Sequence, residues 1–159
     1  MTVNAGSKGA LGRLRSRVAR ALRRVLPARF GALVEEGAEY TLGLGPSLGA
    51  GLVVGANAGG GLFWHRGGLG HYGTLGVMAG ALANASAGMH VTLVKGGPDA
   101  FLGVCHVVGV GVSPAFTFVT ALYTPEHELL GVSLELSLGH AVPVELCIGA
   151  LKTYGRAWS

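Results

Sequence analysis

The chain has 159 residues, of which half are hydrophobic, only 13% are charged and 29 are glycine. This length can bury the core of one domain, and the apolar composition excludes an intrinsically disordered chain, because such chains are polar and charged. Eight of the 12 basic residues and no acid fall in residues 1–30, and only nine charged residues follow Tyr40. Nine charges are too few to cover an ordinary soluble monomer, so we expect much of the surface to meet lipid, another subunit or another segment.

The sequence also argues against a transmembrane helix, a signal peptide and a disulfide framework. No run of about 18 apolar residues is free of glycines and turn residues, so a transmembrane helix is not expected. No basic-then-apolar signal peptide opens the chain. Two cysteines, Cys105 and Cys147, are too few for a disulfide framework, although they fall on different predicted strands and the sequence leaves their pairing open.

Residues 11–26 have the periodicity of an amphipathic helix within a basic N-terminal segment, 1–38. Apolar residues recur at steps of three and four and arginines fill the opposite face. The helix covers the sheet, or lies on an anionic membrane surface, or is an organelle transit peptide; nucleic acid is a weaker option, since no basic groove or aromatic platform follows. The membrane-surface interpretation uses Arg13, Arg17, Arg20, Arg24, Leu14, Val18 and Leu22.

The second predicted region, 39–159, alternates Leu or Val with small or polar residues and is punctuated by Gly and Pro. A period of two predicts strands with one apolar face. We therefore predict an all-β fold of about eight antiparallel strands, in a meander that closes into a barrel or packs as a sandwich. The expected strands are 40–45, 51–64, 71–85, 89–95, 100–112, 115–123 and two arms within 129–152.

Residues 129–152 are predicted to form a β-hairpin around Gly139-His140-Ala141. In this register Leu136 faces Val144, Leu138 faces Val142, and Glu135 lies opposite Glu145. If the barrel is embedded in lipid, both glutamates point inward and the apolar residues point outward. The residues expected on the outer face are Leu130, Val132, Leu134, Leu136, Val142, Val144, Leu146 and Ile148.

Five residues are candidates for an ion or lumen site. An enclosed Glu135–Glu145 pair is a candidate cation site or acidic ring; the alternative is two solvated glutamates on the outside of an ordinary barrel. Guessed registers bring together His90, Asn84 and Cys105, residue types that can activate a thiolate, although structural packing explains the same pattern. The histidines lack metal-ligand spacing, and we expect no catalytic, cofactor or metal site.

Aromatic residues gather where the predicted strands end. Trp64, Tyr72, Tyr123, Tyr154 and Trp158 are candidates for a membrane-interface belt, or for ordinary packing at a barrel end. The tail Thr-Tyr-Gly-Arg-Ala-Trp, 153–158, resembles the C-terminal tail of mycobacterial-type porins. That resemblance implies an oligomeric β-barrel channel.

The sequence thus predicts a non-enzymatic β-barrel that is membrane-associated or oligomeric and forms a channel or pore. Its expected partners are membrane lipid, an apolar ligand or further copies of the chain. A bacterial outer envelope or an organelle outer membrane is the expected location. The alternative is an inverted barrel, with Leu and Val inside, that binds an apolar ligand or lipid in solution or serves as an assembly subunit.

Overall fold

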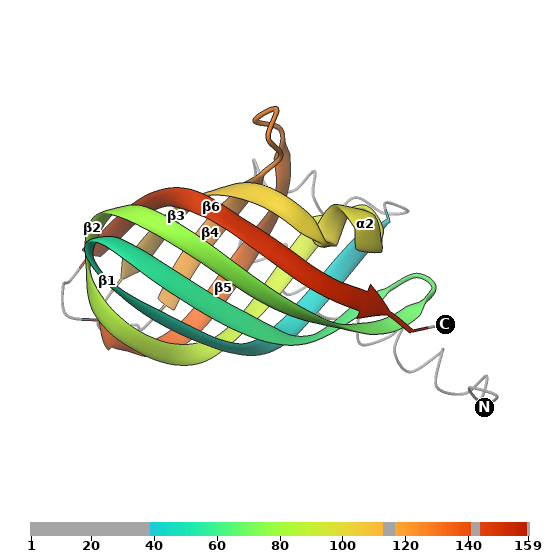
Figure 1. Ribbon diagram of the computed structural model, residues 1–159, viewed down its shortest axis with the longest axis horizontal. Coiled ribbons are helices and arrows are strands. Elements are labelled where there is room, and N and C mark those ends of the chain that lie inside the picture. The colour runs from blue at the N-terminus through green and yellow to red at the C-terminus, as the bar shows by residue number, and fades with distance from the viewer. Residues whose placement is uncertain (1–38, 113–116, 141–143, 159) are drawn as a thin grey trace. The chain divides into compact units, whose positions relative to one another are not determined.

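The computed structural model describes residues 39–112, 117–140 and 144–158 (Figure 1). The basic segment 1–38, with its predicted helix 11–26, lies outside the described residues. The described elements are β1 (Tyr40–His65), β2 (Gly68–Lys95), α2 (Pro98–Phe101), β3 (Gly103–Val112), β4 (Thr117–Tyr123), β5 (Leu129–His140) and β6 (Val144–Ala157).

The strands are antiparallel and close into a barrel. Their order is β1-β2-β5-β4-β3-β6, and β2 also pairs with β6. Closure is possible because β2 changes partner along its length: residues 84–94 pair with β5, and residues 70–81 pair with β6. The all-β prediction is therefore confirmed. The barrel is built from strands of unequal length, two of which, β1 and β2, exceed 25 residues.

Strand β1 folds back on itself at Val53. The register with β2 shifts between Leu52 and Val54, and Val53 has a positive φ of 64°. A Cβ placed on Gly45 would lie 1.7 Å from the carbonyl oxygen of Gly60, so the two halves of β1 lie side by side. Glycine is needed there because any side chain would separate them.

The predicted meander, and with it the 129–152 hairpin, is wrong. Strand β5 pairs with β2 and β4, whereas β6 pairs with β2 and β3. The opposition of Leu136 to Val144 is replaced by its pairing with Met89 and Thr117. Alternation fixes which face a residue occupies, but it does not select the neighbouring strand, and here the two halves of β2 take the places that a hairpin would fill.

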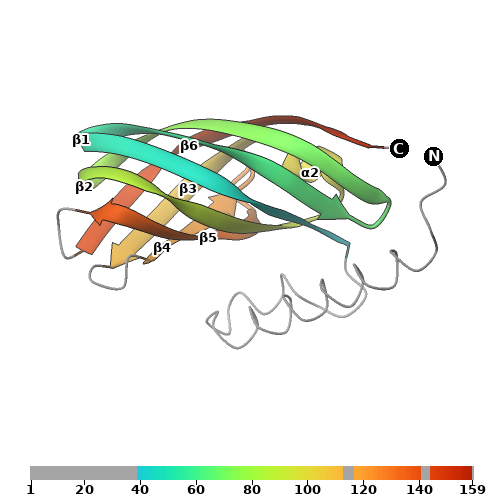
Figure 2. The same ribbon diagram turned by 90° about the horizontal axis from the view of Figure 1, so that it is seen from below.

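The two ends of the barrel differ in what they contain. One end, here called the α2 end, holds the β1–β2 turn at Arg66–Gly67, helix α2, the β4–β5 loop at 124–128 and the end of β6 (Figures 1 and 2). The backbone N–H of Trp158 donates to the carbonyl oxygen of Leu69 at 2.7 Å and ties the C-terminus to this end. The opposite end, here called the Val53 end, holds Val53 and the strand ends at Val112, Thr117, His140 and Val144.

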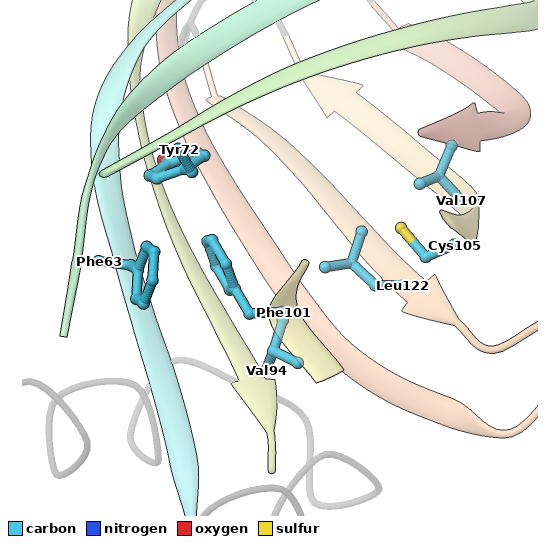
Figure 3. Close-up of a cluster of buried hydrophobic side chains, with 7 residues drawn as sticks. All are labelled: Phe63, Tyr72, Val94, Phe101, Cys105, Val107 and Leu122. Atoms are coloured by element: carbon cyan, nitrogen blue, oxygen red, sulfur yellow. The ribbon is translucent and has the colours of Figure 1, made fainter. Parts of the chain in front are cut away.

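A cluster of apolar side chains fills the barrel beside α2 (Figure 3). Pro98 lies at the start of this four-residue helix, and Phe101 at its end is buried. The Phe101 ring packs edge-on against Tyr72, with centroids 5.0 Å apart, and lies 5.3 Å from the Phe63 ring. The other buried members are Val94, Cys105, Val107 and Leu122.

Candidate functional site

The outer face of the barrel is apolar. Leu52 is 77% exposed, Leu138 is 67% exposed and Ile148 is 64% exposed. Monomeric soluble proteins rarely expose contiguous apolar patches of more than a few hundred Å². The exposed aliphatic side chains on the strands, including the fold in β1, are Leu44, Leu48, Leu52, Val53, Val54, Leu62, Leu75, Val77, Met89, Val104, Val108, Val110, Leu136, Leu138, Val144, Leu146 and Ile148.

The inner face carries the buried polar side chains. His90 is 6% exposed and Glu145 is 1% exposed, although both lie on strands whose neighbouring residues face out. Thr92 and Ser133 form a cross-strand hydrogen bond of 2.8 Å inside the barrel. Buried polar groups of this kind are normally hydrogen-bonded. The remaining buried polar residues of the described strands are Thr41, Ser47, Ser86 and Ser137.

His90 is the centre of the polar part of the lumen. Its Nε2 is hydrogen-bonded to the Tyr72 hydroxyl at 2.5 Å, and the two rings meet edge-on. Glu135 is the cross-strand partner of His90 and is half-buried. Tyr72 in turn packs against Phe101, so the polar group and the aromatic cluster are in direct contact.

A cavity of about 100 Å³ lies in the lumen. His90, Glu135 and Asn57 line it together with Phe101 and Leu122 of the aromatic cluster. This volume is well below the ~300–1,000 Å³ of ordinary ligand pockets. Side chains alone fill the interior of small barrels, and the buried side chains beside this cavity fit that pattern.

The structure separates the two glutamates that the predicted hairpin placed opposite each other. Glu135 pairs across strands with His90 and Phe118. Glu145 pairs with Gly111 of β3 and lies close to Cys147. The predicted like-charge pair is therefore wrong, because β5 and β6 are not neighbours. Both side chains nevertheless belong to the inward-facing set.

The His90, Asn84 and Cys105 group is also not formed by strand pairing. His90 and Asn84 lie on the same strand, where Asn84 pairs with Gly51 and His140. The backbone of Cys105 pairs with Leu151, and its buried side chain belongs to the apolar cluster beside Val107. Reactive cysteines sit in partly exposed, electropositive surroundings, whereas buried apolar cysteines are inert. Both Cys105 and Cys147 are free thiols.

Four of the five predicted belt aromatics lie on or near the outer rim of the α2 end. Tyr154 and Trp158 are exposed, and the Trp158 indole N–H donates to Nδ1 of His71 at 3.0 Å. By alternation Trp64 and Tyr123 face outward, since their neighbours Phe63 and Leu122 are buried. Tyr72 is the exception: it is buried in the lumen, so its assignment to the belt is wrong. Tyr72 was assigned to the belt because it lies near a strand end. Side chains alternate between the two faces of a strand, however, and Tyr72 is on the inward-facing set.

The residues expected on the outer face are exposed in part. Leu136, Val144, Leu146 and Ile148 are exposed, and Leu134 is half-buried. Leu130 packs against the interior cluster, because a register shift in β4–β5 pairing turns it inward. Val132 is buried, with 3% of its surface exposed. Its cross-strand neighbour Leu93 and the next residue along the same row, Leu42, are also buried, at 2% and 7% exposed. Val142 lies outside the described residues.

An apolar groove of about 620 Å³ crosses the outer face over β1, β2, β6 and β3. Val77 and Ile148 lie in it, and Tyr123 lies at its edge. The His106 and His127 rings meet edge-on at 5.5 Å beside it. Sequence reasoning did not find this groove, because its residues are contributed by strands that are distant in sequence.

Sequence reasoning also missed the aromatic side chains that plug the lumen: Phe63, Phe101 and Phe118. A signal for them was present in the inward-facing glycines. A Cβ on Gly43 would lie 2.6 Å from the Phe101 ring, and one on Gly109 would lie 2.4 Å from the Phe118 ring. The Gly-rich face therefore makes room for interior aromatic rings.

Comparisons with protein-family models, with curated proteins and with solved structures found no match to this chain. Within residues 39–112, 117–140 and 144–158, no helix is long and apolar enough to cross a membrane. In the same part of the chain, no three His, Cys, Asp or Glu residues come together as candidate metal ligands.

Proposed function

We propose that this chain is a non-enzymatic membrane β-barrel whose apolar outer face contacts lipid. The observation that carries the proposal is the apolar outer face. On β6, for example, Leu146 and Ile148 are exposed, whereas Glu145 and Cys147 are buried. A soluble barrel usually presents polar side chains on its outer face.

Most of the strands are long enough for this role. A transmembrane strand needs about 9–11 residues, and β3, β5 and β6 have 10, 12 and 14 residues, whereas β4 has 7. The apolar residues of β6 are followed by Lys152 and Tyr154 toward the α2 end. Aromatic and basic residues at that depth match the interfacial girdle of membrane barrels.

The filled lumen favours a closed barrel over a permanently open pore. Phe101 packs in the interior against Tyr72 and Phe63, and the cavity beside them is about 100 Å³. The resemblance of the tail to mycobacterial-type porins implies a channel function. Such a function would require the aromatic group of Phe63, Tyr72 and Phe101 to move out of the lumen. We propose low ion conductance for the resting barrel and a higher conductance when the Phe101 ring is deleted.

The proposal is tested by refolding the full chain from urea into phosphatidylcholine vesicles and extracting the membranes at alkaline pH. We expect the chain to remain in the membrane pellet, to float with the vesicles and to need detergent for a monodisperse solution. A chain that is soluble without detergent and is released by alkaline extraction would refute the proposal. Light scattering on the detergent complex would give the number of copies, which we expect to exceed one.

A second function is favoured by the outer groove. Its volume of about 620 Å³ falls in the range of ligand pockets, and Val77, Val108 and Ile148 give it an apolar floor. A soluble assembly that binds an apolar ligand there would show saturable binding of a fluorescent fatty acid in detergent-free buffer. Ile148→Ser would weaken that binding, whereas Leu138→Ser, at an exposed position outside the groove, would leave it unchanged.

A further inference from the structure

The two ends of the barrel differ sharply in charge. All exposed charged side chains of the described residues lie in the half of the barrel that holds α2. They comprise the strand residues Lys95, Lys152 and Arg156 and the turn and loop residues Glu39, Arg66, Asp99, Glu126 and Glu128. The two remaining charged residues of the strands, Glu135 and Glu145, face the lumen.

Among the residues that the structure describes, those at the Val53 end carry no such charge. In the sequence, residues 81–83, 113–116 and 141–143 also contain no Asp, Glu, Lys or Arg. Leu52, Val53 and Val54 are 77%, 68% and 65% exposed at the fold in β1, and Leu138 and Val144 are exposed on neighbouring strands. Surface turns are normally polar, so an end of this kind has unusual composition.

Backbone geometry gives a second, independent observation at the same place. Val53 has φ of 64°, a conformation that is a genuine outlier for a β-branched residue. Glycine or asparagine would relieve this strain, and both would be more polar at the surface. Strained backbone positions cluster at functional sites, and this one carries an exposed apolar side chain at the tip of the fold.

The interfacial aromatics show the same asymmetry. Tyr154 and Trp158 are exposed at the α2 end, and Trp64 and Tyr123 face outward there. Among the residues that the structure describes, no Trp or Tyr lies at the Val53 end. Typical membrane barrels carry a girdle of aromatic residues at each of the two membrane–water interfaces.

From these observations we propose that the Val53 end is the leading end, which enters and crosses the hydrocarbon of the bilayer, while the α2 end stays on the side from which the chain is added. This inference rests on the proposed membrane function and adds a direction to it. Moving a charged loop through hydrocarbon is costly, so an uncharged tip lowers the barrier for one orientation only. The single aromatic girdle then sits at the interface of entry.

The orientation is measured with the full chain refolded into dilauroylphosphatidylcholine vesicles. Val53→Cys and Arg66→Cys report on opposite ends, and a membrane-impermeant maleimide is added outside. The wild-type chain, whose two thiols are buried, gives the background. We expect Arg66→Cys to be labelled and Val53→Cys to be protected until the vesicles are opened. Equal labelling of the two ends, or the reverse pattern, would overturn the proposal.

Insertion kinetics test the barrier directly. Val53→Lys should slow insertion about ten-fold or more, because a lysine must then cross the membrane. Pro125→Lys, which adds the same charge at the exposed β4–β5 loop, should leave the rate unchanged. Val53→Asn, which removes the apolar side chain without adding a charge, separates the effect of charge from that of lost apolarity. Equal rates for Val53→Lys and Pro125→Lys, in chains that fold equally well in detergent, would overturn the direction of insertion. A wild-type chain that never resists alkaline extraction would instead refute the membrane function itself.

Discussion

The inner and outer faces of this barrel are made by the same strands from alternate residues, yet they follow opposite rules. Outside, Leu136, Leu146 and Ile148 are exposed. Inside, His90 and Glu145 are buried, and glycines accommodate aromatic rings. The difference teaches that burial and polarity are uncoupled in this chain: large apolar side chains are exposed on the outer face, whereas polar side chains are buried inside, beside an apolar cluster.

The largest effect is expected from the lumen. Phe101→Ala removes the ring that packs on Tyr72 and Phe63 and should lower the free energy of unfolding by about 3–5 kcal/mol. It should also increase dye leakage from vesicles, because the plug is lost. Leu138→Ala, an exposed outer position, is the matched control and should do neither. Urea titration in vesicles measures both variants. Equal destabilisation by Phe101→Ala and Leu138→Ala would contradict the claim that the inner face is packed by the protein and the outer face is not.

A charge on the outer face should be nearly as damaging, but only in a bilayer. Ile148→Lys places an ammonium within the apolar band and should destabilise the inserted barrel by about 2–4 kcal/mol, whereas Tyr154→Lys at the rim should cost about 0–1 kcal/mol. The comparison is made by equilibrium unfolding in vesicles. If both variants are equally stable, the outer face does not lie in hydrocarbon.

A methyl group inside the barrel should disrupt packing. In Gly109→Ala the new Cβ would lie 2.4 Å from the Phe118 ring, and such overpacking typically costs about 1–3 kcal/mol. At Gly73 the nearest neighbour of a new Cβ is 3.9 Å away, so Gly73→Ala should be nearly neutral. Adding Phe118→Leu to Gly109→Ala should restore part of the loss, and failure to do so would contradict this packing.

Removal of the Tyr72 hydroxyl should have a smaller effect. Tyr72→Phe deletes the hydrogen bond to His90 and leaves a buried ring nitrogen without its partner, at a cost of about 1–3 kcal/mol. Tyr154→Phe changes an exposed hydroxyl and serves as the control. Thermal unfolding in detergent measures both, and an unchanged transition for Tyr72→Phe would show that the hydrogen bond contributes nothing to stability.

The N-terminal segment should affect attachment without affecting the barrel. Deletion of residues 1–28 removes the predicted apolar stripe and its arginines, each worth up to about 1 kcal/mol at an anionic surface. We expect unchanged unfolding and weaker binding to anionic vesicles, and the same from Val18→Glu with Leu22→Glu. Unfolding of the truncated chain would mean that this segment belongs to the core.

The sequence predicted which residues share one face of a strand, but it did not predict which strands are neighbours in the barrel. The alternation of Leu146 and Ile148 with Glu145 and Cys147 is a local property, so a period of two was sufficient to group these residues by face. The sequence left open which of the two faces is the inner one. The separation of Glu135 from Glu145 depends on strand order, which is decided by the double pairing of β2 along its length. No local pattern in 129–152 carries that information, because every alternating strand offers a similar edge.

The lumen was predictable to a lesser degree. The inward glycines indicated a close approach to some other group, but Phe101 could not be identified, since its position depends on the four-residue helix Pro98–Phe101 that begins directly after Gly96-Gly97. Tyr72 was placed in the aromatic belt by its proximity to a loop, although its parity with Gly70 and Thr74 put it inside. Parity was a better guide here than distance from a strand end.

The central claim, that the outer face lies in hydrocarbon and the inner face does not, is tested most directly by nitroxide labels along β6 in vesicles. Labels at Leu146 and Ile148, and at Glu145 and Cys147 in between, report collision with oxygen and with a water-soluble nickel complex. The account predicts high oxygen and low nickel accessibility at Leu146 and Ile148, and low accessibility to both reagents at Glu145 and Cys147. High nickel accessibility at Leu146 and Ile148 would mean that water covers the outer face and would contradict the account.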